Sequence, residues 1–294
     1  MLKNKKLALL LIVMLVASFS MMGCGNDQQG EAPAEPKGTV EILYVEWACA
    51  TATSNVIAQV LEEKMGYEVN LTPVGAAVMY QGIATGDGDA MFCAWLPVTH
   101  ASYMEEVGDQ VEQLAVNMRG ARIGLVVPEY VDINSIEEMN EVRDQFNGEI
   151  IGIDPGAGIM STTERVIEEY GLDFELVEGS DATMVAALQS AISNEEWVAV
   201  TGWTPHWKFG RWDLKYLEDP LKIYGEEENI YTIVRQGLAE DMPEVYEFFK
   251  NFYWEAEDLA VAMDMAEEPG ATDASAAAKW ISENEGLVNS WISQ

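Results

Sequence analysis

The stretch at residues 94–100 (AWLPVTH) places two side chains of different chemistry five positions apart. The indole face of Trp95 can attract a cation, and the imidazole of His100 can donate a hydrogen bond to a carboxylate. A ligand that carries both charges would satisfy both side chains. A Trp at the end of an apolar run is also typical of a core residue, and this stretch alone is compatible with either role.

Two more Trp residues and a glycine-rich segment share the position of Trp95, at the end of a predicted strand. The strands are predicted over residues 39–47, 90–95, 149–154 and 197–203. Their last residues are Trp47, Trp95, Asp154 and Trp203. Ligands of open α/β sheets bind beyond the carboxyl ends of the strands. We therefore expect the three Trp residues to meet in one cleft.

The glycine-rich segment, residues 156–159 (GAGI), opens a predicted helix over 159–170. The first N–H groups of a helix have no partner within it and can face an anion. The segment lacks the spacing of a dinucleotide-binding loop and the Lys of a P-loop. A carboxylate suits it better than a pyrophosphate, although an ordinary glycine turn would have the same sequence.

Catalytic motifs are missing from the sequence. It contains no H-E-x-x-H, G-x-S-x-G or C-x-x-C, and His100 and His206 are not spaced as metal ligands on one helix. We expect binding without catalysis, and neither cofactor nor metal. His206 and Tyr80 are weaker candidates for ligand contact. Core positions are the simplest interpretation of the remaining large aromatic residues, Trp197, Trp212, Trp254, Trp280 and Trp291.

The order of predicted elements indicates an α/β protein with mainly parallel sheets. Strands and helices alternate from residue 39, the pattern restarts near residue 121, and the chain is mostly helical beyond residue 242. Two lobes are predicted, one formed by 38–120 with 232–294 and the other by 121–231. Among the helices, we expect one over 54–65, capped by Thr53 or Ser54, and another over 274–291.

The first 37 residues have the composition of a leader and a linker. Three Lys residues precede an apolar run at 7–16, and Cys24 follows Gly23, which predicts a signal peptide over 1–23 and a lipid-modified Cys24. The apolar run is short for a retained membrane helix. Residues 24–37, rich in Pro, Gly and Glu, read as a flexible tether. We expect an extracytoplasmic protein anchored to the cell membrane by lipid.

The chain of 294 residues is strongly acidic, with a net charge of -34. This charge excludes nucleic acid and anionic membrane surfaces as partners. Beyond Cys24 only Cys49 and Cys93 remain. Outside the cytoplasm they could form a disulfide, and they could equally be reduced core residues.

Four of these motifs together resemble the substrate-binding proteins of glycine betaine (quaternary ammonium) ABC importers. They are residues 44–47 (YVEW), 94–100 (AWLPVTH), 152–160 (GIDPGAGIM) and 201–207 (TGWTPHW). The resemblance implies a two-lobed periplasmic-binding-protein fold of type II, with two crossover strands and a ligand cleft between lobes that close on the ligand. It also implies a monomer that delivers its ligand to an ABC permease for osmoprotectant uptake.

In this family three Trp residues surround a trimethylammonium group, and the matching positions are Trp47, Trp95 and Trp203. The carboxylate is held by a His, matching His100, and by two backbone amides, matching Gly158 and Ile159. The chain departs from some relatives at residues 48–50 (ACA), where polar or acidic residues can occur.

Several ligands and roles remain open within this resemblance. Proline betaine, carnitine and choline are alternatives to glycine betaine, and choline, which lacks a carboxylate, would leave His100 and the amide of Gly158 unpaired. A sensory ligand-binding module, or an enzyme that acts on a betaine, would use the same fold for another purpose.

Overall fold

The computed structural model describes residues 35–292, and from Pro36 onward these form one compact unit. The predicted signal peptide, Cys24 and most of the predicted tether lie outside the described residues. Within residues 35–292, no helix has both the length and the apolar character needed to cross a membrane.

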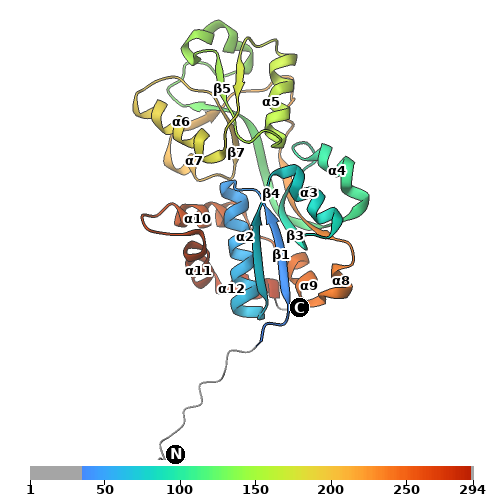
Figure 1. Ribbon diagram of the computed structural model, residues 1–294. Coiled ribbons are helices and arrows are strands. Elements are labelled where there is room, and N and C mark those ends of the chain that lie inside the picture. The colour runs from blue at the N-terminus through green and yellow to red at the C-terminus, as the bar shows by residue number, and fades with distance from the viewer. Residues whose placement is uncertain (1–34, 293–294) are drawn as a thin grey trace, which may run out of the picture. The chain divides into compact units, whose positions relative to one another are not determined.

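The strands in this part of the chain form a nine-stranded sheet in the order β2-β1-β3-β9-β4-β7-β5-β6, with β8 paired to β4 (Figure 1). Their bounds are β1 Thr39–Tyr44, β2 Glu68–Pro73, β3 Ala90–Leu96, β4 Val111–Pro128, β5 Glu149–Ile151, β6 Glu175–Val177, β7 Val200–Thr204, β8 Leu214–Tyr216 and β9 Glu228–Arg235.

The long strand β4 belongs to two sheet regions. Its residues 111–121 pair with β9, and its residues 122–126 pair with β7. We call the part formed by β2, β1, β3, β9 and the start of β4 the first sheet region, and the part formed by the end of β4 with β7, β8, β5 and β6 the second. The sequence predicted only the apolar half of β4, over 121–127, because the other half alternates polar residues and shifts register three times against β9.

The sheet is mixed, so the expectation of mainly parallel sheets was wrong. Strand β1 runs parallel to β2 and β3, and β5 runs parallel to β6 and β7. The pairs β3–β9, β9–β4, β4–β7 and β4–β8 are antiparallel. The reason is that β4 leaves the first sheet region and β9 re-enters it, so the two strands lie side by side in opposite directions. The predicted lobe boundaries fall inside these two strands, and the lobe limits stay a prediction.

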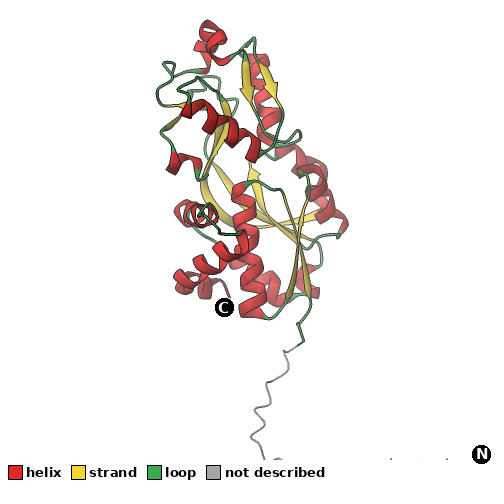
Figure 2. Cartoon of the chain, turned by 60° about the vertical axis from the view of Figure 1, so that its left-hand side comes forward, coloured by secondary structure: helices red, strands yellow, loops and turns green. Residues whose placement is uncertain are grey.

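Helices flank the strands (Figure 2). Their bounds are α2 Ala48–Val60, α3 Ala76–Thr85, α4 Ala101–Val107, α5 Gly158–Glu169, α6 Asp181–Ser193, α7 Lys208–Arg211, α8 Leu238–Asp241, α9 Pro243–Asn251, α10 Ala256–Ala266, α11 Asp273–Glu283 and α12 Glu285–Ile292. A π-helical turn, Leu61–Met65, continues α2, and 3-10 helices span Gly108–Gln110 and Ile136–Phe146.

Helix α2 begins six residues before its predicted start at Ser54, directly after Trp47. Thr53 is therefore no cap: it is buried within the helix, and its hydroxyl donates to the carbonyl of Cys49. The side chain of Trp47 does not cap the helix either, and the first N–H group, that of Ala48, instead donates to the Asp181 carboxylate at 2.9 Å. A cap that comes from 133 positions away leaves no local sequence signal.

The helix predicted over 274–291 is two helices, α11 and α12, which are separated at Asn284. Helices α10 and α11 pack on α2, and α12 packs on α9. Between them the rings of Trp254 and Trp280 lie 5.5 Å apart, and those of Trp280 and Trp291 6.0 Å apart. All three are buried, which confirms the interpretation of these residues as core.

Candidate functional site

One cavity brings together the six residues that the resemblance assigned to ligand contact. The space between its walls is about 310 Å³, part of which is open to solvent. Its lining includes Trp47, Trp95, His100, Gly158, Ile159 and Trp203. No local sequence signal marks the remaining lining residues, which are Cys49, Thr99, Ile123, Ile153 and Ala157. Most of these are small or aliphatic side chains of the kind that fill any core.

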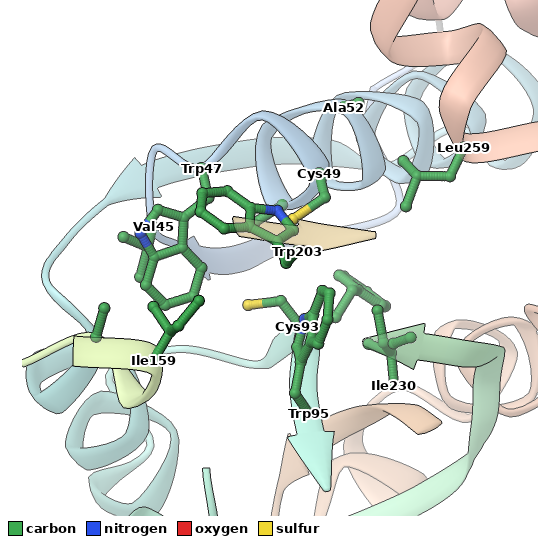
Figure 3. Close-up of a cluster of buried hydrophobic side chains, with 14 of the residues drawn as sticks. Val45, Trp47, Cys49, Ala52, Cys93, Trp95, Ile159, Trp203, Ile230 and Leu259 are labelled. Atoms are coloured by element: carbon green, nitrogen blue, oxygen red, sulfur yellow. The ribbon is translucent and has the colours of Figure 1, made fainter. Parts of the chain in front are cut away.

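Both sheet regions contribute to this cavity. Trp47 lies between β1 and α2, and Trp95 lies near the end of β3. Trp203 lies near the end of β7, and Gly158 is the first residue of α5 in the second sheet region. Figure 3 shows the indoles of Trp47 and Trp203 beside each other, with Trp95 and Ile159 pointing toward them. The expected convergence of strand ends is thus what places the three indoles together.

Two hydrogen bonds join His100 to the backbone of Trp95, one through its imidazole and one through its own backbone. The Trp95 N–H donates to Nδ1 of His100 at 3.1 Å, and the His100 N–H donates to the Trp95 carbonyl at 2.9 Å. Burial lowers the pKa of His100 to about 4, with the Cys93 backbone opposing this shift. A neutral imidazole whose Nδ1 accepts a hydrogen bond carries its proton on Nε2. His100 is therefore an uncharged donor at neutral pH.

The loop that carries His100 is anchored by the buried carboxylate of Glu228, on β9. One of its oxygens accepts from the N–H groups of Val98 at 2.7 Å and Thr99 at 3.0 Å, and the other accepts from the Thr99 hydroxyl. Glu228 is only 1% exposed. The sequence analysis missed this residue because nothing distinguishes it locally among 50 acidic residues.

Four contacts close the cavity between the two sheet regions. The indole N–H of Trp47 donates to Asp154 at 3.1 Å, and the Ala48 N–H donates to Asp181. The Tyr103 hydroxyl donates to the carbonyl of Gly156. The fourth contact is the closest: a Cβ atom on Gly158 would lie 1.9 Å from the carbonyl oxygen of Thr99. Only glycine fits at this position with the two regions in contact.

The two cysteines of the described residues, Cys49 and Cys93, are not joined by a disulfide. Cys49 and Cys93 are both buried free thiols, and Cys49 lies beside the indole of Trp203 (Figure 3). Burial raises the pKa of Cys49 to about 12 and raises that of Cys93 as well. Both thiols are therefore protonated and unreactive at neutral pH.

The two weaker candidates lie behind the cavity wall and do not line it. The ring of Tyr80 packs edge-on against that of His100, with 5.7 Å between centroids. His206 packs edge-on against Trp203 at 4.9 Å, and its Nε2 lies 3.1 Å from an oxygen of Asp181. Both side chains support residues of the cavity rather than facing it.

This arrangement suits one kind of ligand. Three indoles offer π faces to a cation, and the backbone N–H groups of Gly158 and Ile159, at the start of α5, donate to no other backbone group that the structure describes. No group of three or more His, Cys, Asp or Glu residues within 35–292 is placed to hold a metal ion. The cavity can bind a cation and an anion at once.

Comparisons with known proteins point to the same chemistry. Residues 38–283 match the family described as the substrate-binding domain of ABC-type glycine betaine transport systems. The glycine betaine/carnitine transport binding protein GbuC of Listeria monocytogenes is 45% identical over 154 residues. That match spans about half the length of each chain, 51% of both.

Two solved structures cover most of the chain. Lactococcal OpuAC in its closed conformation with glycine betaine is 38% identical, with a TM-score of 0.83, over 87% of this chain and 99% of that one. An ABC-transporter choline-binding protein in complex with choline is 25% identical, with a TM-score of 0.81, over 87% and 91%. The α/β fold expected for periplasmic binding proteins is confirmed.

The burial of His100 predicts a contribution to acid sensitivity. In the unfolded chain a His takes up a proton as the pH falls through about 6.5, whereas in the folded protein His100 does so only near pH 4. Between these values the unfolded state binds more protons, so the stability that His100 provides is complete above pH 6.5 and is lost as the pH falls toward 4. The loss amounts to about 3 kcal/mol.

We therefore expect His100→Gln to flatten the dependence of the unfolding free energy on pH between 7 and 4. Urea titrations at several pH values would measure it for both proteins. His206 is unchanged in the variant, so its own titration cancels in the difference. Parallel pH profiles would show that His100 is not buried as a neutral side chain.

Proposed function

Because the chain belongs to the family of substrate-binding domains of ABC-type glycine betaine transport systems, we propose that it captures glycine betaine outside the cytoplasm and delivers it to an ABC permease. Proline betaine has the same pattern of charges and is a second ligand under this proposal. Proteins of this family bind a solute and do not convert it, which agrees with the absence of catalytic motifs.

The observation that carries the proposal is the meeting of Trp47, Trp95 and Trp203 with His100 around one cavity. A quaternary ammonium group has no proton to donate, so aromatic faces are the receptor that suits it. An ordinary amino acid would need an acidic partner for its ammonium group, and no Asp or Glu of residues 35–292 lines the cavity.

The proposed roles divide the ligand between its two charges. Trp47, Trp95 and Trp203 surround the trimethylammonium group, while Nε2–H of His100 and the amides of Gly158 and Ile159 bind the carboxylate. Three desolvated cation–π contacts contribute about 1.5 to 6 kcal/mol, and each hydrogen bond to the charged carboxylate about 1.5 to 3 kcal/mol. After the cost of association this reaches the roughly 8 kcal/mol of a micromolar complex.

Export and anchoring form a second part of the proposal. Its support is the sequence alone: the basic and apolar leader at 1–23, Cys24 directly after it, and the polar linker at 24–37. Under this proposal Cys24 carries the lipid that holds the protein at the outer face of the membrane, and the linker gives the monomeric domain reach toward the permease.

Choline and carnitine are the alternatives with specific support. The name of the Listeria relative includes carnitine, and one of the similar structures contains choline. Choline lacks a carboxylate, however, and would leave the donors of His100, Gly158 and Ile159 unpaired in a closed cavity. Unpaired buried donors cost about 1 to 3 kcal/mol each, which favours glycine betaine. A sensory module of the same fold would bind the same ligand.

We expect Trp95→Ala to weaken glycine betaine binding at least thirtyfold, since it removes one wall of the cage. Isothermal titration calorimetry would measure the change. Trp197→Ala, which removes a Trp that packs on Phe146 away from the cavity, is the matched control and should bind as wild type does. Undiminished affinity in the Trp95 variant would rule out the cage as described.

His100→Ala should act on one class of ligand only. Glycine betaine should bind at least tenfold more weakly, because a hydrogen bond to its carboxylate is lost, whereas choline affinity should stay within about twofold. Calorimetry with both ligands would separate these effects. Equal losses for the two ligands would mean that His100 acts through the shape of the cavity.

Gly158→Ala should prevent the closed arrangement, because the added methyl group would meet the Thr99 carbonyl oxygen. We expect glycine betaine affinity to fall at least tenfold, as the two sheet regions must separate to admit the methyl group. Gly286→Ala is the control, since a Cβ atom there has nothing within 4 Å. A Gly158 variant that bound as tightly as the control would argue against closure at this contact.

A further inference from the structure

Lys208, the first residue of α7, is a buried cation beside the cavity that the proposed function does not use. The side chain is fully buried. Its Nζ atom lies 4.1 Å from the centroid of the Trp203 ring and 5.5 Å from that of Phe209. Nζ has no hydrogen-bond partner among the described residues. The π face of Trp203 is thus its closest favourable contact.

The ammonium of Lys208 and the cavity both contact the indole of Trp203. Trp203 lines the cavity, whereas Lys208 does not. A ligand cation within about 6 Å of the ring would lie within roughly 10 Å of Nζ. The medium between them is protein rather than water, so they repel each other appreciably.

Among the described residues, no group forms an ion pair or a hydrogen bond with the Lys208 ammonium, although the Asp181 carboxylate attracts it. Asp181 of α6 accepts hydrogen bonds from Ala48 and His206, and forms no ion pair with Lys208. His206, just before α7, accepts the backbone N–H of Lys208 at Nδ1, and burial lowers its pKa to about 4, so it is neutral. Cys49 of α2 is a protonated thiol.

We propose that Lys208 is a specificity-determining residue, which makes the cavity bind zwitterions in preference to ligands with a net positive charge. The inference rests on the proposed function. A net cation such as choline is repelled by Lys208 and has no carboxylate to offset that repulsion. In glycine betaine the carboxylate is attracted to Lys208 and offsets most of that repulsion. Lys208 thereby adds to the preference that the carboxylate donors provide, and it does so without touching the ligand.

This preference depends on pH. Burial lowers the pKa of Lys208 to about 7, although Asp181 and Cys49 act in the opposite direction. As the pH rises through 7, Lys208 loses its proton, the repulsion disappears and choline binds more tightly. His100 and His206 have pKa values of about 4 and are neutral throughout the range from 6 to 8. Among Lys208, His100 and His206, therefore, Lys208 is the group that titrates between pH 6 and pH 8.

The test is the ratio of the choline and glycine betaine dissociation constants, measured by calorimetry at pH 6 and pH 8. For Lys208→Met we expect choline affinity at pH 6 to rise about tenfold and glycine betaine affinity to change by less than about threefold. Lys208→Arg keeps the charge and should retain the wild-type ratio at pH 6, but that ratio should no longer depend on pH. A ratio within twofold of wild type in Lys208→Met would overturn the inference.

The wild-type protein alone provides a second arm, which does not depend on how the variants fold. Its choline-to-betaine ratio should fall severalfold from pH 6 to pH 8, and an unchanged ratio would contradict the inference. The two proposals fail differently. Wild-type protein that binds neither ligand would overturn the proposed function, whereas tight glycine betaine binding with a ratio that ignores both pH and Lys208→Met would overturn this inference alone.

Discussion

The cavity exists because the Thr99 carbonyl and Gly158 approach so closely that no side chain fits between them. This contact joins the loop after β3 to the start of α5, and thus the first sheet region to the second. Around it, Trp47 donates to Asp154 and Tyr103 donates to Gly156. The three indoles come from both regions, so they surround one space only while these contacts hold. A ligand bound in this space would touch both regions and would thereby favour the arrangement in which they are in contact.

Closure also completes the local structure of α2. The first N–H of this helix has no cap from its own neighbourhood and donates to Asp181, in the second sheet region. Burial raises the pKa of Asp181, but the hydrogen bond from His206, the charge of Lys208 and the hydrogen bond from Ala48 together lower it by more, so the carboxylate stays ionised as a cap requires. A negative charge at a helix N-terminus is stabilising. The N-terminus of α2, which positions Trp47, is thus capped by a residue of the second sheet region.

Much of the site could be predicted because its residues follow strand ends, and strand ends converge in an α/β sheet. Trp47, Trp95 and Trp203 could be placed together from short apolar runs and their last residues. The roles of Glu228 and Asp181 could not be predicted, because each accepts hydrogen bonds from backbone N–H groups more than 125 positions away. In a chain this acidic, nothing in the local sequence distinguishes them from other acidic residues. The start of α2 was missed for the same reason. The antiparallel centre of the sheet was missed because half of β4 is polar.

Aromatic rings line the cavity, and three ionisable groups lie just outside this lining. The indoles line the cavity, and the ionisable groups Asp181, His206 and Lys208 lie outside this lining. An unpaired ammonium is costly to bury. An uncharged side chain of the same length would pack against Trp203 at lower cost. The burial of Lys208 has a function if its charge acts on the ligand that Trp203 binds. A cage of π faces recognises a positive head group but does not distinguish ligands by the rest of their structure. A second positive charge behind one of its walls makes the net charge of the whole ligand part of what is recognised.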